Sequence, residues 1–215
     1  MDGSKILSRS EVAAVLADLE RRGKRSLNSR LNLIVFRLSC CCGLRAKEIV
    51  GLDMGDVAVS SPRSAIRVRK EITKGQDGKR RSRIVPLWWD AGTAADIAAW
   101  KQFRLDSGAG KDDPFLCQQQ PGHTGKRINE SLAAKRWRTA IKTLGTARAK
   151  QLSIHCGRHS YCTHALFVGR SLAEVRDAAG HRNISTTSIY LHYLERPGIP
   201  DLFCFAADNP SAVSG

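Results

Sequence analysis

The sequence predicts an α+β domain that is mainly helical, with one small three-stranded antiparallel sheet. Several segments have the apolar spacing of amphipathic or buried helices. One basic segment instead has short apolar runs on both sides of Asp77-Gly78, a pair that strongly favours a hairpin turn. The chain has 215 residues, which is enough for one domain with its own hydrophobic core.

Two helices are expected before the sheet. Ser8 or Ser10 starts an amphipathic helix that continues through Leu19. The apolar run from Arg30 to Cys42 predicts a buried central helix, and Gly43 ends it.

The three-stranded sheet is expected between Ala65 and Val85, with helices after it. The last predicted helix is short, is capped by Ser185 and places Tyr190 about one turn from its start. Between the sheet and this last helix, the expected elements are a surface helix at Thr93 to Leu105, a short strand at Phe115-Leu116, and helices at Ile128 to Leu144, Ser160 to Val168 and Leu172 to Ala178.

Four residues suited to phosphate chemistry lie between positions 155 and 190. Arg158 carries a planar fork of donors that matches two phosphate oxygens and stays charged. His155 and His181 titrate near neutrality, so each can donate a hydrogen bond or move a proton. The Tyr190 hydroxyl, with an ordinary pKa of about 10, is a weak nucleophile until nearby cations stabilise its phenolate. Together they suit metal-free phosphoryl transfer; the alternative for Tyr190 alone is a packing residue in a helix.

A second candidate cluster lies upstream, where Arg45 follows Gly43 at the start of a short helix. The backbone N–H groups and the dipole at a helix start favour a bound anion. Glu48 comes one turn later and can orient the Arg45 guanidinium. The alternative is a surface arginine in a helix-capping ion pair.

These separated boxes resemble the signature of the tyrosine recombinases, also called the phage integrase family. The family spacing of nine residues separates His181 from Tyr190. The boxes occur in the family's order, and they hold Arg45, His155 and Arg158, Gly180-His181, and Tyr190. The resemblance covers most of the chain and implies the fold of the tyrosine-recombinase catalytic domain.

The resemblance also implies a mechanism in which DNA is cut and rejoined through a 3′-phosphotyrosyl intermediate. Tyr190 would attack the scissile phosphate, while Arg45, Arg158 and His181 stabilise the pentacoordinate phosphorane. His155 would either accept the Tyr190 proton or hold the phosphate. No metal, ATP or other cofactor is needed.

A lysine on the hairpin is the remaining implied catalytic residue, because the leaving 5′-oxygen needs a proton. Thr73-Lys74-Gly75 resembles the Gly-Lys-Gly of the family, so Lys74 is the preferred candidate and Lys70 and Lys79 are its rivals. The hairpin is also expected to bind DNA phosphates, through Lys70, Lys79, Arg80 and Arg81.

Two positions depart from the family pattern. Gly157 stands where a leucine usually precedes the second arginine, and Ala179 replaces the leucine that usually precedes Gly-His. Both changes remove apolar bulk beside catalytic residues, so they affect packing and rate more than the class of reaction.

Charge and composition indicate the partner. The chain has 35 Lys and Arg against 20 Asp and Glu, a formal charge of +15, and this favours double-stranded DNA. It lacks an apolar run of 18 residues and a signal-peptide pattern, so no membrane contact and a cytoplasmic, nucleoid-associated location are expected. The seven cysteines lack C-x-x-C spacing and are expected to be reduced. A zinc site among the histidines and cysteines of residues 155–164 is a weaker alternative.

The expected domain organisation is a catalytic domain over residues 1–195 and a tail over residues 196–215. The tail docks either on a neighbouring protomer or back on its own domain. No N-terminal core-binding domain is expected within this chain, which is either a naturally short recombinase or an excised domain.

Three functions follow from these observations. The first is a site-specific recombinase of the integrase or invertase type, working as a tetramer on paired sites. The alternatives are a nicking and religating enzyme that resembles type IB topoisomerases, and a DNA-binding regulator without catalysis.

Overall fold

The computed structural model describes residues 3–59, 63–73, 81–119, 122 and 124–193. The helices are α1 (Arg9–Gly23), α2 (Leu27–Phe36), α3 (Ala46–Gly51), α4 (Ala91–Asp106), α5 (Glu130–Ala140), α6 (Thr146–Gln151), α7 (Ile154–Phe167), α8 (Leu172–Ala179) and α9 (Ile184–Ser188). The 3-10 turns are η1 (Gly3–Lys5), η3 (Met54–Asp56), η4 (Lys70–Ile72), η5 (Ile141–Leu144) and η6 (Ile189–Tyr193), and η2 (Arg37–Cys41) is a π-helical turn. The strands are β1 (Val57–Ala58), β2 (Ala65–Val68) and β3 (Arg83–Pro86).

The helical class with a three-stranded antiparallel sheet is confirmed, in the order β1-β2-β3. The predicted range of the sheet was wrong at its start, because the first strand, β1, precedes Ala65. Val57 pairs with Ile66, and Ile66 pairs with Val85, so one face of the sheet is apolar and buried. A two-residue strand is too short to show alternation, which is why the sequence pattern did not reveal it.

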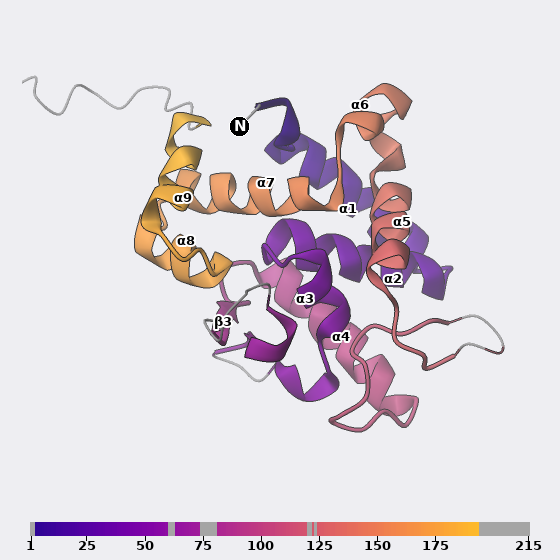
Figure 1. Cartoon of the computed structure of the whole chain (residues 1–215). Helices are drawn as coiled ribbons and strands as arrows, with labels where there is room; N and C mark the ends of the chain where they lie inside the picture. Colours follow the sequence, from indigo (N-terminus) through magenta and orange to yellow (C-terminus); the bar gives the residue numbers. More distant parts are fainter. Residues whose placement is uncertain (1–2, 60–62, 74–80, 120–121, 123, 194–215) are drawn as a thin grey trace, which may run out of the picture.

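The centre of the molecule is formed by α2, η2 and α7, as Figure 1 shows for α2 and α7. Helix α7 lies across the middle, with α8 and α9 at one end and α5 and α6 at the other. The predicted central helix is confirmed, although it begins at Leu27 and its last part is the π-helical turn η2. Phe36 in α2 stacks on Trp137 in α5 at 5.1 Å between ring centroids, which fixes α5 against this core.

The π-helical turn η2 joins the central helix to the segments of the candidate site. Its hydrogen bond from the Cys42 N–H to the Arg37 carbonyl, 3.0 Å long, replaces the usual α-helical spacing. Arg37 is buried but is bonded to Asp96 at 2.8 Å and Glu20 at 3.1 Å. The Ser39 hydroxyl donates to the Ile154 carbonyl at 2.7 Å, and this bond fastens η2 to the start of α7.

Several helix boundaries differ from their predicted positions. Helix α1 starts after the Ser8 cap as expected, but it continues to Gly23. Helix α7 starts at Ile154 rather than Ser160, with Ser153 as its cap. Gly157 interrupts the helical pattern of the sequence, but in the structure it is closely packed within the helix. The helix predicted from Ile128 is α5 followed by η5 and begins after the Asn129 cap.

Two predicted features of the middle of the chain were wrong. Phe115-Leu116 forms no strand; both residues are buried, and isolated bridges lie on either side of them. Helix α4 is not simply a surface helix, because Trp100 is buried and its indole N–H donates to the Phe115 carbonyl at 2.9 Å.

The six cysteines among the described residues are unpaired. Burial raises the pKa of Cys40, Cys41 and Cys42, so these thiols stay protonated. Within the described ranges, no helix combines the length and the apolarity that crossing a membrane requires.

Candidate active site

Arg45 occupies the cap position of α3, as the sequence predicts. Gly43 has a φ of +66°, which lets the chain turn sharply between η2 and α3, and a side chain at this position would strike the Tyr161 ring. Glu48 accepts a hydrogen bond from the Arg45 backbone N–H at 2.8 Å and from its guanidinium at 3.1 Å. The carboxylate therefore holds both ends of Arg45.

Arg83 is a member of the cluster that no sequence motif indicates. It opens β3, and its guanidinium forms two bonds to the Glu48 carboxylate, at 2.9 and 2.8 Å. Its Nε donates to the Ala178 carbonyl in α8 at 2.9 Å. Arg83 thus joins α3, β3 and α8. These partners lie 35 and 95 residues away in sequence, so no local pattern marks it.

Glu48 is completely buried between these two arginines. Burial would raise its pKa, but the hydrogen bonds and charge of Arg83, followed by those of Arg45, lower the pKa overall. The carboxylate is therefore ionised at neutral pH and serves as the central acceptor of the cluster.

Arg158 lies in the second turn of α7 and is 5% exposed. Its Nη1 donates to the Gly43 carbonyl at 2.7 Å. Its Nη2 is buried and has no hydrogen-bond partner in the described part of the chain. Burial, followed by the charge of Arg45, lowers the pKa of Arg158 to about 10. A buried donor without an acceptor is costly, and a bound anion would satisfy it.

His181 lies directly after α8. Gly180 ends that helix with a φ of +69°, and a Cβ there would lie 2.8 Å from the Arg83 Cδ. Both the backbone conformation and the lack of space therefore require glycine at this position. The His181 ring bonds to the Thr187 hydroxyl at 2.9 Å. Burial, followed by the charges of Arg158, Arg45 and Arg83, lowers the pKa of His181 to about 3. The imidazole is therefore neutral in the free protein.

Tyr190 lies in η6 and is 4% exposed. The predicted cap of the preceding helix was wrong, because Asn183 rather than Ser185 caps α9, and its side chain accepts from the Ser185 N–H. The Tyr190 hydroxyl bonds to His159 Nδ1 at 2.8 Å, and its ring is nearly parallel to that of His181, with centroids 6.2 Å apart. Burial raises the pKa of Tyr190 despite the opposing charges of Arg158 and Arg45.

The other predicted site residues do not join this cluster in the described structure. His155 is exposed in the first turn of α7. Lys70 in η4 and Arg81 before β3 are exposed near the base of the predicted hairpin. Lys74, Lys79, Arg80 and the Asp77-Gly78 turn lie outside the described residues.

The expected loss of packing at Gly157 did not occur. A Cβ at this position would lie 2.2 Å from the Ser39 hydroxyl and 2.9 Å from the Trp137 ring, so these groups fill the space of the family leucine. Ala179, the other departure, is fully buried. The backbone before Arg158 is therefore closely packed.

A metal site is not formed by the histidines and cysteines of α7. His159 contacts Tyr190, His164 bonds to the Leu7 carbonyl, and His155 is exposed, so the three rings do not converge. Among the described residues, no group of three or more His, Cys, Asp or Glu side chains is arranged to hold a metal ion.

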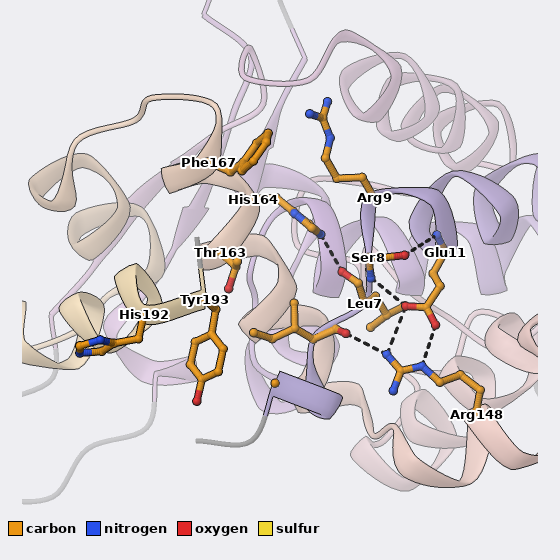
Figure 2. A pocket seen from close by; sticks show the side chains of 12 residues that line it. Leu7, Ser8, Arg9, Glu11, Arg148, Thr163, His164, Phe167, His192 and Tyr193 are labelled. Carbon is orange, nitrogen blue, oxygen red and sulfur yellow. Dashed lines mark hydrogen bonds and ion pairs between the residues drawn. The ribbon is translucent and has the colours of Figure 1, made fainter. Parts of the chain in front are cut away.

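A separate pocket of about 720 Å³ lies between the N-terminal segment and the second half of α7 (Figure 2). The Arg148 guanidinium bonds to Glu11 at 2.6 Å beside it, and the His164 ring points to the Leu7 carbonyl at 2.8 Å. His192 and Tyr193 at the end of η6 line another side. None of the predicted catalytic residues lines this pocket.

The fold resembles that of solved recombinase structures. The crystal structure of XerA recombinase matches with a TM-score of 0.68 and 21% identity, over 88% of this chain and 59% of that chain. XerH site-specific recombinase, bound to palindromic difH substrate in a post-cleavage complex, matches with a TM-score of 0.67 and 23% identity, over 87% and 49% of the two chains. At these identities the likeness shows the fold alone.

The fold, the family model and the curated relatives together define the class: this is a tyrosine recombinase catalytic domain. Residues 5–196 match the model of the phage integrase family, and the chain belongs to that family.

Curated relatives agree with this assignment. Tyrosine recombinase XerC of Chromobacterium violaceum is 33% identical over 188 residues, which are 86% of this chain and 55% of the relative. XerC of Corynebacterium efficiens is 31% identical over 163 residues, which are 76% and 46%. The chain spans about half the length of these relatives.

The low pKa of His181 predicts that the protein loses stability as the pH falls below about 6.5. Its pKa is about 3 in the folded protein against 6.5 ordinarily. Between these values the unfolded chain binds a proton that the folded protein excludes, so acid favours unfolding. His159 and His164, whose pKa values are also lowered by burial, act in the same direction.

Urea midpoints at about pH 7.5 and about pH 5.5 would measure this effect, since ordinary carboxylates, with pKa values of about 4, stay almost fully ionised at both. We expect a lower midpoint at the acidic pH, and a smaller difference between the two values in His181→Asn. An equal difference in both proteins would show that His181 is not the group responsible.

Proposed function

We propose that this chain cuts and rejoins double-stranded DNA as the catalytic part of a site-specific recombinase. The observation that carries the proposal is the buried Tyr190 hydroxyl beside a cationic cluster in which Nη2 of Arg158 has no partner within the described ranges. The cluster sets three arginines, Arg45, Arg83 and Arg158, against the single carboxylate of Glu48. Such a site has excess positive charge and suits a phosphodiester.

In the proposed reaction Tyr190 attacks the scissile phosphorus and the 5′-oxygen leaves. Arg158 and Arg45 donate to the nonbridging oxygens, and His181 donates a hydrogen bond from its neutral ring. Lys74, which we retain as the proposed acid, would protonate the 5′-oxygen. The attack of another 5′-hydroxyl on the phosphotyrosine then reverses these steps and conserves the energy of the bond.

The proposed partner is DNA held largely through its phosphates. The formal charge of +15 supports this choice. XerH and the Tn1549 transposon integrase were both crystallised in complex with DNA. Exposed Lys70 and Arg81 are proposed to contact the backbone near the hairpin, together with Lys79 and Arg80. We further propose that the chain works as a tetramer on paired sites, as the family resemblance implies.

The test is incubation with nicked DNA carrying candidate recombination sites. In this substrate the short fragment that bears the new 5′-hydroxyl diffuses away after cleavage. The wild-type protein should form a covalent adduct that survives denaturation, and Tyr190→Phe should form none, because the nucleophilic oxygen is absent. Tyr193→Phe is the matched control, since it removes a hydroxyl three residues away and should leave the adduct intact.

Peptide mapping of the adduct should place the DNA on Tyr190. The absence of an adduct on every DNA tested would favour a regulator that binds DNA without catalysis. Relaxation of supercoiled DNA by the dilute monomer would instead favour a nicking and religating enzyme that resembles type IB topoisomerases.

A further inference from the structure

We propose that His159 is the group that accepts the Tyr190 proton during cleavage and returns it during rejoining. This inference rests on the proposed function, and it gives His159 a role for which the sequence alone makes His155 a candidate. Nδ1 of His159 lies 2.8 Å from the Tyr190 hydroxyl oxygen, which is the atom proposed to attack phosphorus. A general base acts within hydrogen-bond reach, about 2.6–3.2 Å, of the oxygen whose proton it removes.

The position of His159 is set by α7. It follows Arg158 directly, so the arginine whose Nη2 has no partner among the described residues and the histidine that contacts the phenol are neighbours on one helical turn. The ring is partly buried, and its centroid lies 5.9 Å from that of Tyr190. His155 lies one turn earlier and is exposed; among the described residues, it has no hydrogen bond to the Tyr190 hydroxyl.

The electrostatic setting explains why Tyr190 needs a base. Burial raises the pKa of its phenol, and the contact with the Cys162 thiol acts in the same direction. The charges of Arg158 and Arg45 oppose this rise but do not reverse it. A phenol in this state does not lose its proton to water at neutral pH, and proton transfer to a neighbouring base removes this obstacle.

His159 is suited to accept that proton in the free protein. Burial lowers its pKa, and the nearby charges of Arg158 and His155 act in the same direction, so the ring is neutral at neutral pH. The ring of His181, on which the charge of His159 also acts, is neutral as well. When its proton is on Nε2, Nδ1 of His159 is free to accept.

The proposed step is balanced. The bond from the Tyr190 oxygen to phosphorus forms as the bond from phosphorus to the 5′-oxygen breaks. The phenolic proton moves to Nδ1 of His159, which becomes an imidazolium, and the 5′-oxygen takes its proton from the separate acid proposed above. The negative charge of the bound phosphodiester offsets the new charge beside Arg158. Rejoining runs the transfer backwards, so His159 ends neutral.

The test compares His159→Ala and His159→Asn with the wild-type protein in single-turnover adduct formation on saturating nicked DNA. Loss of a general base should slow the reaction about 10²-fold or more in both variants. Added imidazole should restore part of the rate in His159→Ala, which leaves space for it, and the rescue should increase with the neutral fraction of the imidazole. His164→Ala, a histidine of the same helix that bonds to the Leu7 carbonyl, should keep the wild-type rate without imidazole dependence.

Three outcomes would overturn the proposal. The first is a wild-type or faster rate in His159→Ala, which would mean that His159 only holds Tyr190 in a resting position. The second is a slow variant that imidazole does not rescue, in a protein whose folding and DNA affinity are intact. The third is a nitrogen NMR spectrum of the free protein in which Nδ1 of His159 carries the proton. That spectrum needs no DNA, so it decides the hydrogen-bond state even if the wild-type protein forms no adduct, a result that would overturn the proposed function itself.

Discussion

Replacing Glu48 with alanine is expected to lower the free energy of unfolding by about 3–5 kcal/mol, the range measured when one partner of a buried ion pair is removed. Glu48 is fully buried and receives two bonds from Arg83 and two from Arg45. The variant leaves the Arg83 guanidinium enclosed without its counterion. Urea denaturation of the wild-type protein and of Glu48→Ala under the same conditions measures the difference in unfolding free energy.

A matched control for Glu48→Ala is Glu130→Ala. Glu130 is an exposed glutamate in the first turn of α5, where its interaction with the helix dipole contributes less than about 1 kcal/mol. Glu48→Gln preserves the shape but not the charge and should lie between alanine and wild type. If Glu48→Ala lost no more stability than the control, the carboxylate would not be the centre of the cluster.

Replacing Arg158 with methionine is expected to change stability and activity in opposite directions. Nη2 of the buried guanidinium has no partner among the residues that the structure describes, and burial lowers the pKa of Arg158 to about 10, so the folded protein holds a poorly solvated charge. An apolar side chain of similar length should raise the unfolding free energy by about 1 kcal/mol. Adduct formation should fall by roughly 10²–10³-fold, the loss typical when one preorganised donor is removed.

Arg21→Met is the control for this experiment, because Arg21 is exposed in α1 and pairs with Asp18 at the surface. It should change neither the unfolding free energy nor adduct formation appreciably. A loss of about 2 kcal/mol or more in Arg158→Met would instead make the arginine a structural residue whose bond to the Gly43 carbonyl outweighs its desolvation.

Local patterns predicted the parts of the fold and site that depend on neighbouring residues. The turn at Gly43 and the cap position of Arg45 follow from a few adjacent residues, and the structure shows both. The apolar run of the central helix also marks a buried element reliably.

Long-range pairing set the parts that could not be predicted. Arg83 looks like any charged residue of a basic hairpin, and its importance comes from partners in α3 and α8. His159 is one of several histidines in a short segment, and only the fold shows which ring meets Tyr190. The start of α7 was misplaced because glycine is a poor helix former, and tertiary packing overrides that local preference.

The contact between Gly157 and Trp137 has a consequence for consensus engineering. A family profile ranks each position separately, and it would recommend leucine at 157 as a stabilising substitution. In this chain the Ser39 hydroxyl and the Trp137 indole already occupy that volume, so the recommended residue collides with η2 and with α5. The three positions are therefore epistatic: a library that restores the leucine must vary positions 39 and 137 at the same time.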